Sequence, residues 1–141
     1  MAIYTNRVVW KGAHLGHTYC GNDTDMEFSA PPTLQGHPKM MTPEDALIMA
    51  VNTCVHMMVI WAAERFKLDM VSYECTATGE VEEFIDQTSW FKKITLAPAI
   101  SVRGSSETVV KRALQLAYKY STIAQSVKSE VVIEPFIKIL V

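Results

Sequence analysis

The sequence is short of cysteine, and this shortage excludes several classes of protein. Only three cysteines occur among 141 residues, an odd number with no CxxC pair. Such a count excludes a disulfide framework and a structural zinc site, and it suits a reducing compartment. We therefore expect a cytoplasmic protein with no bound metal and no cofactor.

Runs of like charge are also absent. The formal net charge is -2, and neither a basic stretch nor an acidic tail occurs, which argues against a nucleic-acid-binding surface. The first ten residues, MAIYTNRVVW, lack a signal-peptide pattern. The chain is 49% hydrophobic and 20% charged, an ordinary globular balance, and its length predicts one domain over residues 1–141.

One long apolar run does occur, ALIMAVNTCVHMMVIWAA at residues 46–63. It approaches the ~20 residues that a bilayer requires, but Asn52, Thr53 and His56 fall near its middle, where polar groups are costly. A helix that is apolar on all faces is typical of a protein core. The run therefore predicts a central helix buried on most sides by its own protein, and no membrane span.

Short strands are predicted around this helix and a second one. Thr42, Pro43 and Asp45 have the spacing of an N-cap, a first helical residue and a capping box, and the helix is expected to end near Lys67. Pro98 indicates an edge strand or a bulge. Strands are predicted at residues 3–10, 14–20, 26–30, 70–82, 89–104 and 130–141, a loop at 31–41 and a second helix at 107–128. This βββ-α-ββ-α-β order predicts an α+β fold.

Cys54 stands in the middle of the apolar run, and its role is open from the residues alone. Buried cysteine is commonly inert, whereas a reactive thiol needs a cation, an acid–base partner or a helix N-terminus. Cys54 lies about three turns into the helix, and His56 points to another face. Glu44 precedes Cys54 by ten residues, about 15 Å along a straight helix. The two residues share a site only if the helix breaks or a second copy supplies one of them.

The other candidate residues have simpler interpretations. His14 and His17 are three residues apart on a predicted strand and point to opposite faces, so we expect no shared metal. Cys20 and Cys75 are interpreted as structural residues of predicted strands, and either could resolve a Cys54 sulfenate only if the fold brings it close to Cys54. The methionines of the apolar run are typical of a core, and they also suit a pocket for an apolar ligand.

Three segments together resemble the OsmC/Ohr family: TPEDALIMAVNTCVHMMVIWAAERFKL, LAPAISVRGSSETVVKRALQLAYKYSTIAQSVKSEVVIEP and VVWKG. The likeness covers nearly the whole chain, and the order and spacing of the segments make it specific. It implies an OsmC-like fold, an interlocked homodimer with sites at the interface, and reduction of organic hydroperoxides. By motif position, it implies that Cys54 is the peroxidatic cysteine and that Glu44 helps to hold the thiolate and the peroxide.

The resemblance also implies a catalytic cycle, from which this sequence departs at two places. In the family, a cysteine of the second helix resolves the sulfenic acid as a disulfide, which a dithiol then reduces. Here Ser121 stands at that position, and serine forms no disulfide. In the family, an arginine from the N-terminal β-region also helps to hold the thiolate and the peroxide. No arginine occurs in the corresponding turn here, KGAHLGH. Arg7, Lys11, His14 and His17 are the nearby cations or potential cations, and the motif assigns none of them.

Two functions follow from these residues. In the first, Cys54 reduces a hydroperoxide and an external thiol resolves the sulfenate. In the second, the chain keeps the fold and binds a small apolar ligand without turnover, which Ser121 and the missing arginine favour. The spacing of Glu44 and Cys54 favours the first. The expected partners are a second copy of the chain, a small-molecule hydroperoxide and an external thiol reductant, with neither nucleic acid nor a membrane.

Overall fold

The computed structural model describes residues 1–141, which form two compact units, residues 1–47 and 48–141. Each unit has its own sheet, of three strands in the first and four in the second. The α+β class is confirmed. A single domain over the whole chain stays a prediction.

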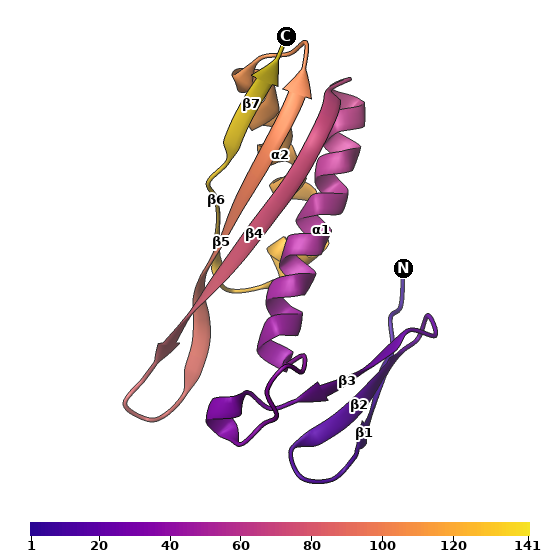
Figure 1. The fold of residues 1–141 in the computed structure, drawn as a ribbon, viewed down its shortest axis with the longest axis vertical. Helices are drawn as coiled ribbons and strands as arrows, with labels where there is room; N and C mark the ends of the chain where they lie inside the picture. The colour runs from indigo at the N-terminus through magenta and orange to yellow at the C-terminus, as the bar shows by residue number, and fades with distance from the viewer. The chain divides into compact units, whose positions relative to one another are not determined.

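The smaller unit contains an antiparallel sheet whose strands pair in sequence order (Figure 1). Its elements are β1 (Asn6–Trp10), β2 (Leu15–Cys20), β3 (Asp25–Ser29) and a short 3-10 helix, η1 (Pro32–Leu34). The three strands lie within two or three residues of the predicted bounds. The turns between them are short, so successive strands pair as antiparallel neighbours.

The segment after β3 is the predicted loop, and specific contacts hold it. The buried hydroxyl of Ser29 accepts a hydrogen bond from the backbone N–H of His37 at 2.8 Å. Gly36 packs so closely on Ala30 that a Cβ atom there would overlap the Ala30 carbonyl oxygen. Only glycine fits at this approach, and the loop therefore has a defined path.

Helix α1 (Pro43–Arg65) begins at the predicted capping box. The backbone N–H of Asp45 donates to Thr42 Oγ1 at 3.1 Å, and the Thr42 hydroxyl donates to Asp45 Oδ2 at 2.8 Å. These bonds satisfy groups that a helix N-terminus leaves free. The helix ends two residues before the predicted Lys67, which has a left-handed backbone with φ of 54°.

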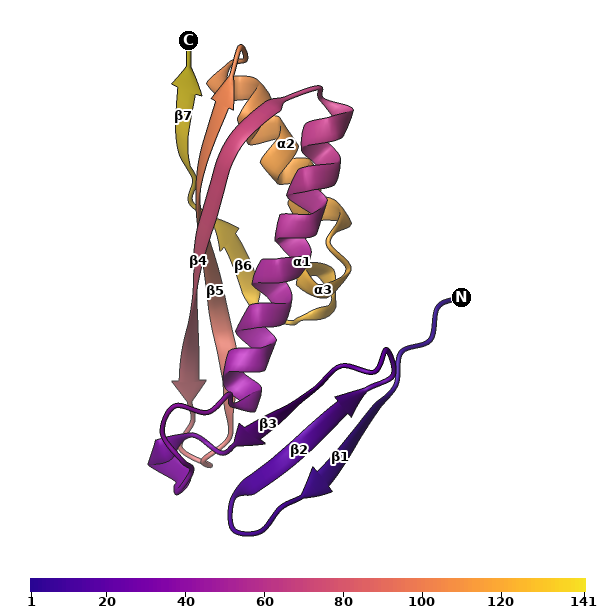
Figure 2. The ribbon, with the colours of Figure 1, turned by 45° about the vertical axis from the view of Figure 1, so that its right-hand side comes forward.

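The larger unit is a four-stranded sheet with α1 and α2 on one face (Figures 1 and 2). Strand β5 is central, antiparallel to β4 on one side and parallel to β6 and β7 on the other. The elements after α1 are β4 (Asp69–Glu83), β5 (Ser89–Arg103), α2 (Glu107–Tyr120), α3 (Thr122–Ser126), β6 (Glu130–Ile133) and β7 (Phe136–Leu140).

The structure corrects two predicted elements. The helix expected over residues 107–128 is interrupted at Ser121, whose φ of -73° and ψ of 109° are extended, so α2 and α3 are separate helices. The strand expected over residues 130–141 is divided at Glu134 and Pro135 into β6 and β7. A proline has no N–H for the sheet ladder, which accounts for the second break.

Pro98 was predicted at an edge or a bulge, and it lies instead in the central strand β5, paired in register with Cys75 of β4. On its other side, β6 pairs with Lys93–Leu96 and β7 with Ala99–Arg103. Pro98 therefore falls in the gap between β6 and β7. On the β6 and β7 side of β5 no strand residue is paired with Pro98, so a residue without an N–H is tolerated there.

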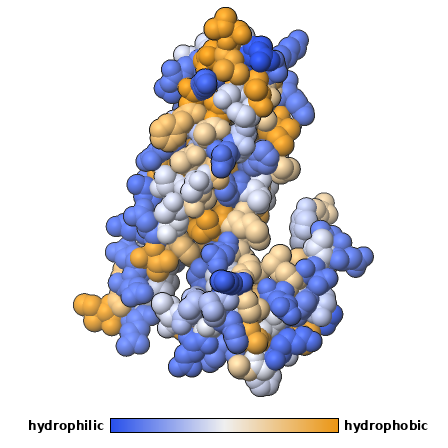
Figure 3. All heavy atoms as spheres, viewed as in Figure 1, coloured by the Kyte–Doolittle hydropathy of each residue, from blue (hydrophilic) through white to orange (hydrophobic).

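Helix α1 supplies core residues to the larger unit, but its burial is one-sided. Val51, Val55 and Val59 are at most 2% exposed and join the hydrophobic core, whereas Met49 and Met57 are 46% and 52% exposed. Figure 3 shows hydrophobic atoms at the surface of the larger unit among hydrophilic ones. This corrects the expected burial on most sides. By length and composition α1 is able to cross a bilayer, a test that core helices of soluble proteins also pass.

Candidate functional site

Cys54 lies midway along α1 as a free, partly exposed thiol. It precedes the core residue Val55 by one position, which places it about 100° around the helix from the core. Met58, Trp61 and Arg65 follow Cys54 by four, seven and eleven residues and share its side of the helix. Because these three residues line a cavity together with α2, Cys54 lies on the side of α1 that faces α2.

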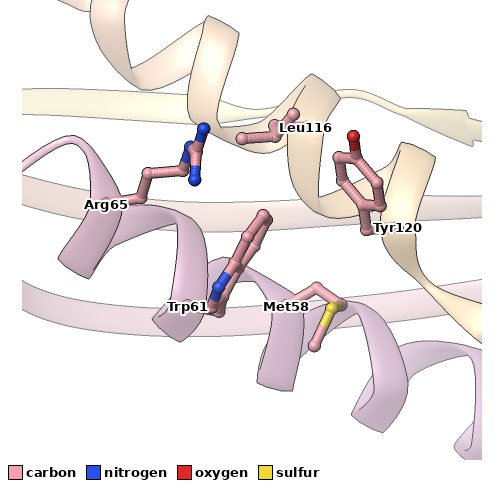
Figure 4. A pocket seen from close by; sticks show the side chains of 5 residues that line it. All are labelled: Met58, Trp61, Arg65, Leu116 and Tyr120. Carbon is pink, nitrogen blue, oxygen red and sulfur yellow. The ribbon is translucent and has the colours of Figure 1, made fainter.

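The cavity between α1 and α2 has a volume of about 320 Å³. Met58, Trp61 and Arg65 line it from α1, and Leu116 and Tyr120 line it from α2 (Figure 4). The rings of Trp61 and Tyr120 meet edge to face, with centroids 5.5 Å apart. The lining is mostly apolar and suits a hydrocarbon group. Of the methionines of the run, only Met58 contributes to it, and Met49 and Met57 are exposed.

His56 lies on the opposite side of α1 from Cys54. Its ring stacks on Tyr73 of β4, with centroids 4.7 Å apart and planes at 30°. Nearby, the side-chain amide of Asn52 donates to the Cys75 carbonyl at 3.1 Å. Asn52 and His56 therefore face β4, and Cys54, between them in sequence, points away. The structure separates His56 and Cys75 from Cys54 within one chain, so neither is the partner of that thiol there.

A second cavity, of about 230 Å³, lies beside this stack. His56 Nδ1 and Tyr73 Oη are buried without a hydrogen-bond partner. Burial raises the pKa of the Cys75 thiol, and burial together with the adjacent Cys75 raises the pKa of Tyr73. Both groups are held in their protonated forms. Cys75 also packs against the hydrophobic core.

Glu44 lies in the first turn of α1, next to the capping residue Asp45. Asp45 forms the capping bonds with Thr42, whereas Glu44 Oε2 is buried and has no hydrogen-bond partner. A buried carboxylate oxygen without a partner is costly. Because α1 is continuous, Glu44 and Cys54 lie about 15 Å apart along it and are not brought together within one chain.

Ser121 occupies the junction of α2 and α3 and is fully buried. Its hydroxyl accepts a hydrogen bond from the backbone N–H of Ala124, and its own N–H donates to the Tyr118 carbonyl, both at 3.2 Å. The side chain therefore caps the N-terminus of α3. Serine and threonine are favoured caps, so the local role of Ser121 is structural.

In the smaller unit, four side chains form a row of contacts that the sequence did not predict. The Arg7 guanidinium lies 4.2 Å from the centroid of the Tyr19 ring, and the rings of Tyr19 and His17 are 4.6 Å apart. His17 Nε2 lies 2.7 Å from Asp25 Oδ1. Successive side chains of paired strands point to opposite faces of the sheet, and this alternation is the signal that could have predicted which of these side chains are neighbours on one face. By contrast, His14 is exposed and has no side-chain hydrogen bond.

No group of three or more histidine, cysteine, aspartate or glutamate side chains has an arrangement that suits a metal ion.

Residues 36–135 match the family model of the OsmC-like proteins. The chain belongs to the OsmC-like family. The match includes α1 with Glu44 and Cys54, and it also includes α2 and the Ser121 cap that follows it.

Solved structures of OsmC-like proteins share this fold. An OsmC-like protein of unknown function from Vibrio cholerae is 21% identical, with a TM-score of 0.86 over 96% of this chain and 99% of that one. An OsmC-like protein from Mycoplasma pneumoniae is 17% identical, with a TM-score of 0.80 over 99% of both chains. An organic hydroperoxide resistance protein from Elizabethkingia anophelis is 11% identical, with a TM-score of 0.75 over 99% of this chain and 98% of that one. Among curated proteins, none matches this sequence.

Proposed function

We propose that this OsmC-like protein is a thiol-dependent peroxidase that reduces organic hydroperoxides through Cys54. The observation that carries the proposal is the pair formed by Cys54 and Glu44, ten residues apart on the helix that the family model matches. Glu44 Oε2 is buried and has no hydrogen-bond partner within the chain, so this oxygen is available to a group from a second copy. A solved relative is an organic hydroperoxide resistance protein, which supports the same reaction.

The proposed reaction has two stages. The Cys54 thiolate attacks one oxygen of the hydroperoxide, an S–O bond forms, the O–O bond breaks, and the leaving alkoxide takes a proton to become an alcohol. The sulfur is oxidised by two electrons to a sulfenic acid. An external dithiol then displaces water from the sulfenic acid, and its second thiol displaces Cys54 from the mixed disulfide. The dithiol leaves as a disulfide, and the Cys54 thiolate is restored.

An external reductant is proposed because neither position 121 nor Cys75 offers Cys54 a second thiol. Ser121 stands at the position of the resolving cysteine and serves as a helix cap. Cys75 lies on the β4 side of α1, away from Cys54. The reductant is therefore expected from outside, and a reducing cytoplasm is the proposed compartment.

A homodimer is part of the proposal. Within one continuous helix, Glu44 and Cys54 do not meet, so a site that uses both needs Glu44 of one copy and Cys54 of another. The exposed Met49 and Met57 on α1 are apolar surface that a second copy would cover. Light scattering at micromolar concentration tests this, and a monomer mass contradicts the shared site.

The peroxidase is tested by trapping its sulfenic acid. The reduced protein is treated with a modest excess of cumene hydroperoxide and then with dimedone, and the intact mass is measured. We expect one adduct, which disappears in Cys54→Ala and persists in the matched variants Cys20→Ala and Cys75→Ala. If Cys54 remains a thiol while the peroxide is in excess, the peroxidase proposal fails.

A second function, ligand binding without turnover, is favoured by two observations. The Ser121 hydroxyl is buried as a cap, and an apolar cavity of about 320 Å³ lies on the Cys54 side of α1. Steady-state consumption of hydroperoxide with excess dithiothreitol discriminates between the two functions. Turnover that depends on Cys54 supports the enzyme, and a single stoichiometric oxidation without turnover supports the binding protein.

A further inference from the structure

The cavity on the β4 side of α1 has walls that two contacts hold in place. Its volume is about 230 Å³. The rings of His56 and Tyr73 stack with centroids 4.7 Å apart, and the Asn52 amide donates to the Cys75 carbonyl at 3.1 Å. Because both contacts join α1 to β4, the cavity is formed before any ligand enters. The residues that line it are Asn52, Thr53, His56, Tyr73, Glu74 and Cys75.

Two buried polar atoms of this lining lack a hydrogen-bond partner. They are His56 Nδ1 and Tyr73 Oη, one from each of the stacked rings. A buried polar atom without a partner costs the free energy of removing it from water. In the larger unit, these are the only two buried side-chain nitrogen or oxygen atoms without a partner. Since both belong to residues that line one cavity, a single occupant would supply both missing partners.

The size and charge of the cavity indicate the kind of occupant. A volume of about 230 Å³ is far larger than one buried water needs, so it accommodates a small organic molecule. The lining contains no lysine or arginine but includes the carboxylate of Glu74, which disfavours an anion. Burial raises the pKa of both Tyr73 and Cys75, which keeps these two groups uncharged. The occupant is therefore expected to be neutral.

We propose that this cavity binds a small neutral phenol. The hydroxyl group of a phenol is both a donor and an acceptor, so its oxygen accepts from the Tyr73 hydroxyl and donates to His56 Nδ1. The phenol ring packs against the stacked rings of the two residues, because aromatic pairs are favourable. A phenol is uncharged near neutral pH, since the pKa of a phenolic group is about 10.

The site goes beyond the proposed peroxidase, because binding there does not need Cys54 to react. His56 and Tyr73 lie on the opposite side of α1 from Cys54. Binding is therefore measured in Cys54→Ser as well as in the native chain, and we expect equal affinities. Failure of the dimedone experiment leaves the phenol site intact, and failure of phenol binding leaves the peroxidase intact.

The probes are phenol, anisole and toluene, titrated into isotope-labelled protein and followed through the amide chemical shifts in NMR spectra. The three molecules have similar shapes, but anisole lacks the O–H donor and toluene lacks the oxygen as well. We expect phenol to bind about fivefold or more tightly than either, because only phenol forms both hydrogen bonds. The largest shifts should occur at Asn52, His56 and Tyr73.

Two ring variants test the hydrogen bonds. Tyr73→Phe and His56→Phe keep a ring in the stack but remove the hydroxyl and the imidazole nitrogens, respectively. Each should reduce the preference for phenol over toluene to about twofold or less. Tyr120→Phe removes a hydroxyl from the cavity on the other side of α1, and as the matched control it should leave the preference unchanged. Circular dichroism confirms that each variant is folded.

Melting temperatures without ligand provide a separate measurement. Because Tyr73→Phe removes a buried group that has no partner, the variant should melt at least as high as the native chain. A lower melting temperature would show that the hydroxyl already has a partner, which overturns the proposal. Equal affinities for phenol and toluene, no binding of phenol, or shifts centred on Trp61 and Tyr120 also overturn it. Phenol binding that appears only on dilution to a monomer assigns the cavity to a second copy of the chain, with the same consequence.

Discussion

The hydroxyl of Ser121 accepts a hydrogen bond of 3.2 Å from the backbone N–H of Ala124. This bond starts α3 at the position where the family pattern places a resolving cysteine. In the sequence, Ser121 replaces the resolving cysteine of the family. In the structure, the same residue is a buried helix cap. Both aspects of Ser121 lead to experiments.

Removing the cap should destabilise the fold. We expect Ser121→Ala to lower the free energy of unfolding by about 1 kcal/mol, the usual effect of losing a serine cap. Thermal or urea denaturation measures the change. Ser126→Ala, which removes an exposed hydroxyl bonded to the Thr122 carbonyl, is the matched control and should cost less. Equal losses of unfolding free energy in the two variants would show that the Ser121 cap contributes no more stability than the exposed Ser126 hydroxyl.

Restoring a thiol at this position tests the motif assignment. Ser121→Cys should form a disulfide with Cys54 after one equivalent of cumene hydroperoxide, because a nearby thiol attacks the sulfenic acid. The product is a mass loss of two hydrogens and, after digestion, a cross-linked peptide that joins Cys54 to the introduced thiol. Thr122→Cys, one residue on and exposed, is the comparison and should form less cross-link. A sulfenic acid that persists in Ser121→Cys contradicts the assignment.

Glu44 and Asp45 are adjacent, and we expect them to have different roles. Glu44→Gln should lower the second-order rate constant for cumene hydroperoxide by roughly 10- to 100-fold, because the carboxylate is proposed to position the reacting groups. Stopped-flow measurement of Cys54 oxidation gives this value. Asp45→Ala removes the bonds to Thr42 and should instead cost about 1 kcal/mol of stability. Because Asp45 serves only the cap, its loss should leave the rate constant unchanged while the variant is folded.

The half-buried Cys75 thiol should react slowly with alkylating reagents. Burial raises its pKa, so less of the nucleophilic thiolate is present near neutral pH than at an exposed cysteine. With iodoacetamide at about pH 8, we expect Cys75 to be modified several-fold more slowly than the exposed Cys20. Peptide mass spectrometry at successive times measures both rates. Faster reaction at Cys75 would contradict its burial.

The same shift predicts a dependence of stability on alkaline pH. The folded state favours the protonated thiol of Cys75, so this contribution is fully present below the pKa of the unfolded thiol, about 8.5. It is lost as the pH rises through the higher pKa of the folded state. Cys75→Ala should therefore lose less stability than the native chain between about pH 8 and pH 10. Cys20→Ala is the control and should follow the native chain.

Much of the fold was predictable because the signals are local. Thr42, Pro43 and Asp45 predict the start of α1, since a capping box depends only on residues within one turn. Alternating polar and apolar residues predict β4 and β5 to within about a residue. Ser121 was predicted to lie inside a helix, and it was misassigned because serine is tolerated in helices as well as favoured at their caps.

The parts that were not predictable depend on neighbours distant in sequence. The local sequence predicts that Pro98 lies at an edge or a bulge. The central strand accepts it only because β6 and β7 leave a gap between them opposite this residue. The cavity between α1 and α2 combines Trp61 with Tyr120, which are far apart in the chain and meet only in the packed unit. Helical spacing predicted that His56 and Cys54 diverge, but it gave no indication that His56 stacks on Tyr73.

By itself, the sequence determined the family, the order of the elements and the ten-residue step from Glu44 to Cys54, because periodicity, caps and motif spacing are properties of the chain. Tertiary structure alone decided what surrounds these residues. It buried Ser121 as a cap, left Glu44 Oε2 without a partner, and placed Cys54 and Cys75 on different sides of α1. The physical reason is that burial and hydrogen bonding depend on which elements pack together, and packing is set by the whole core rather than by any single segment.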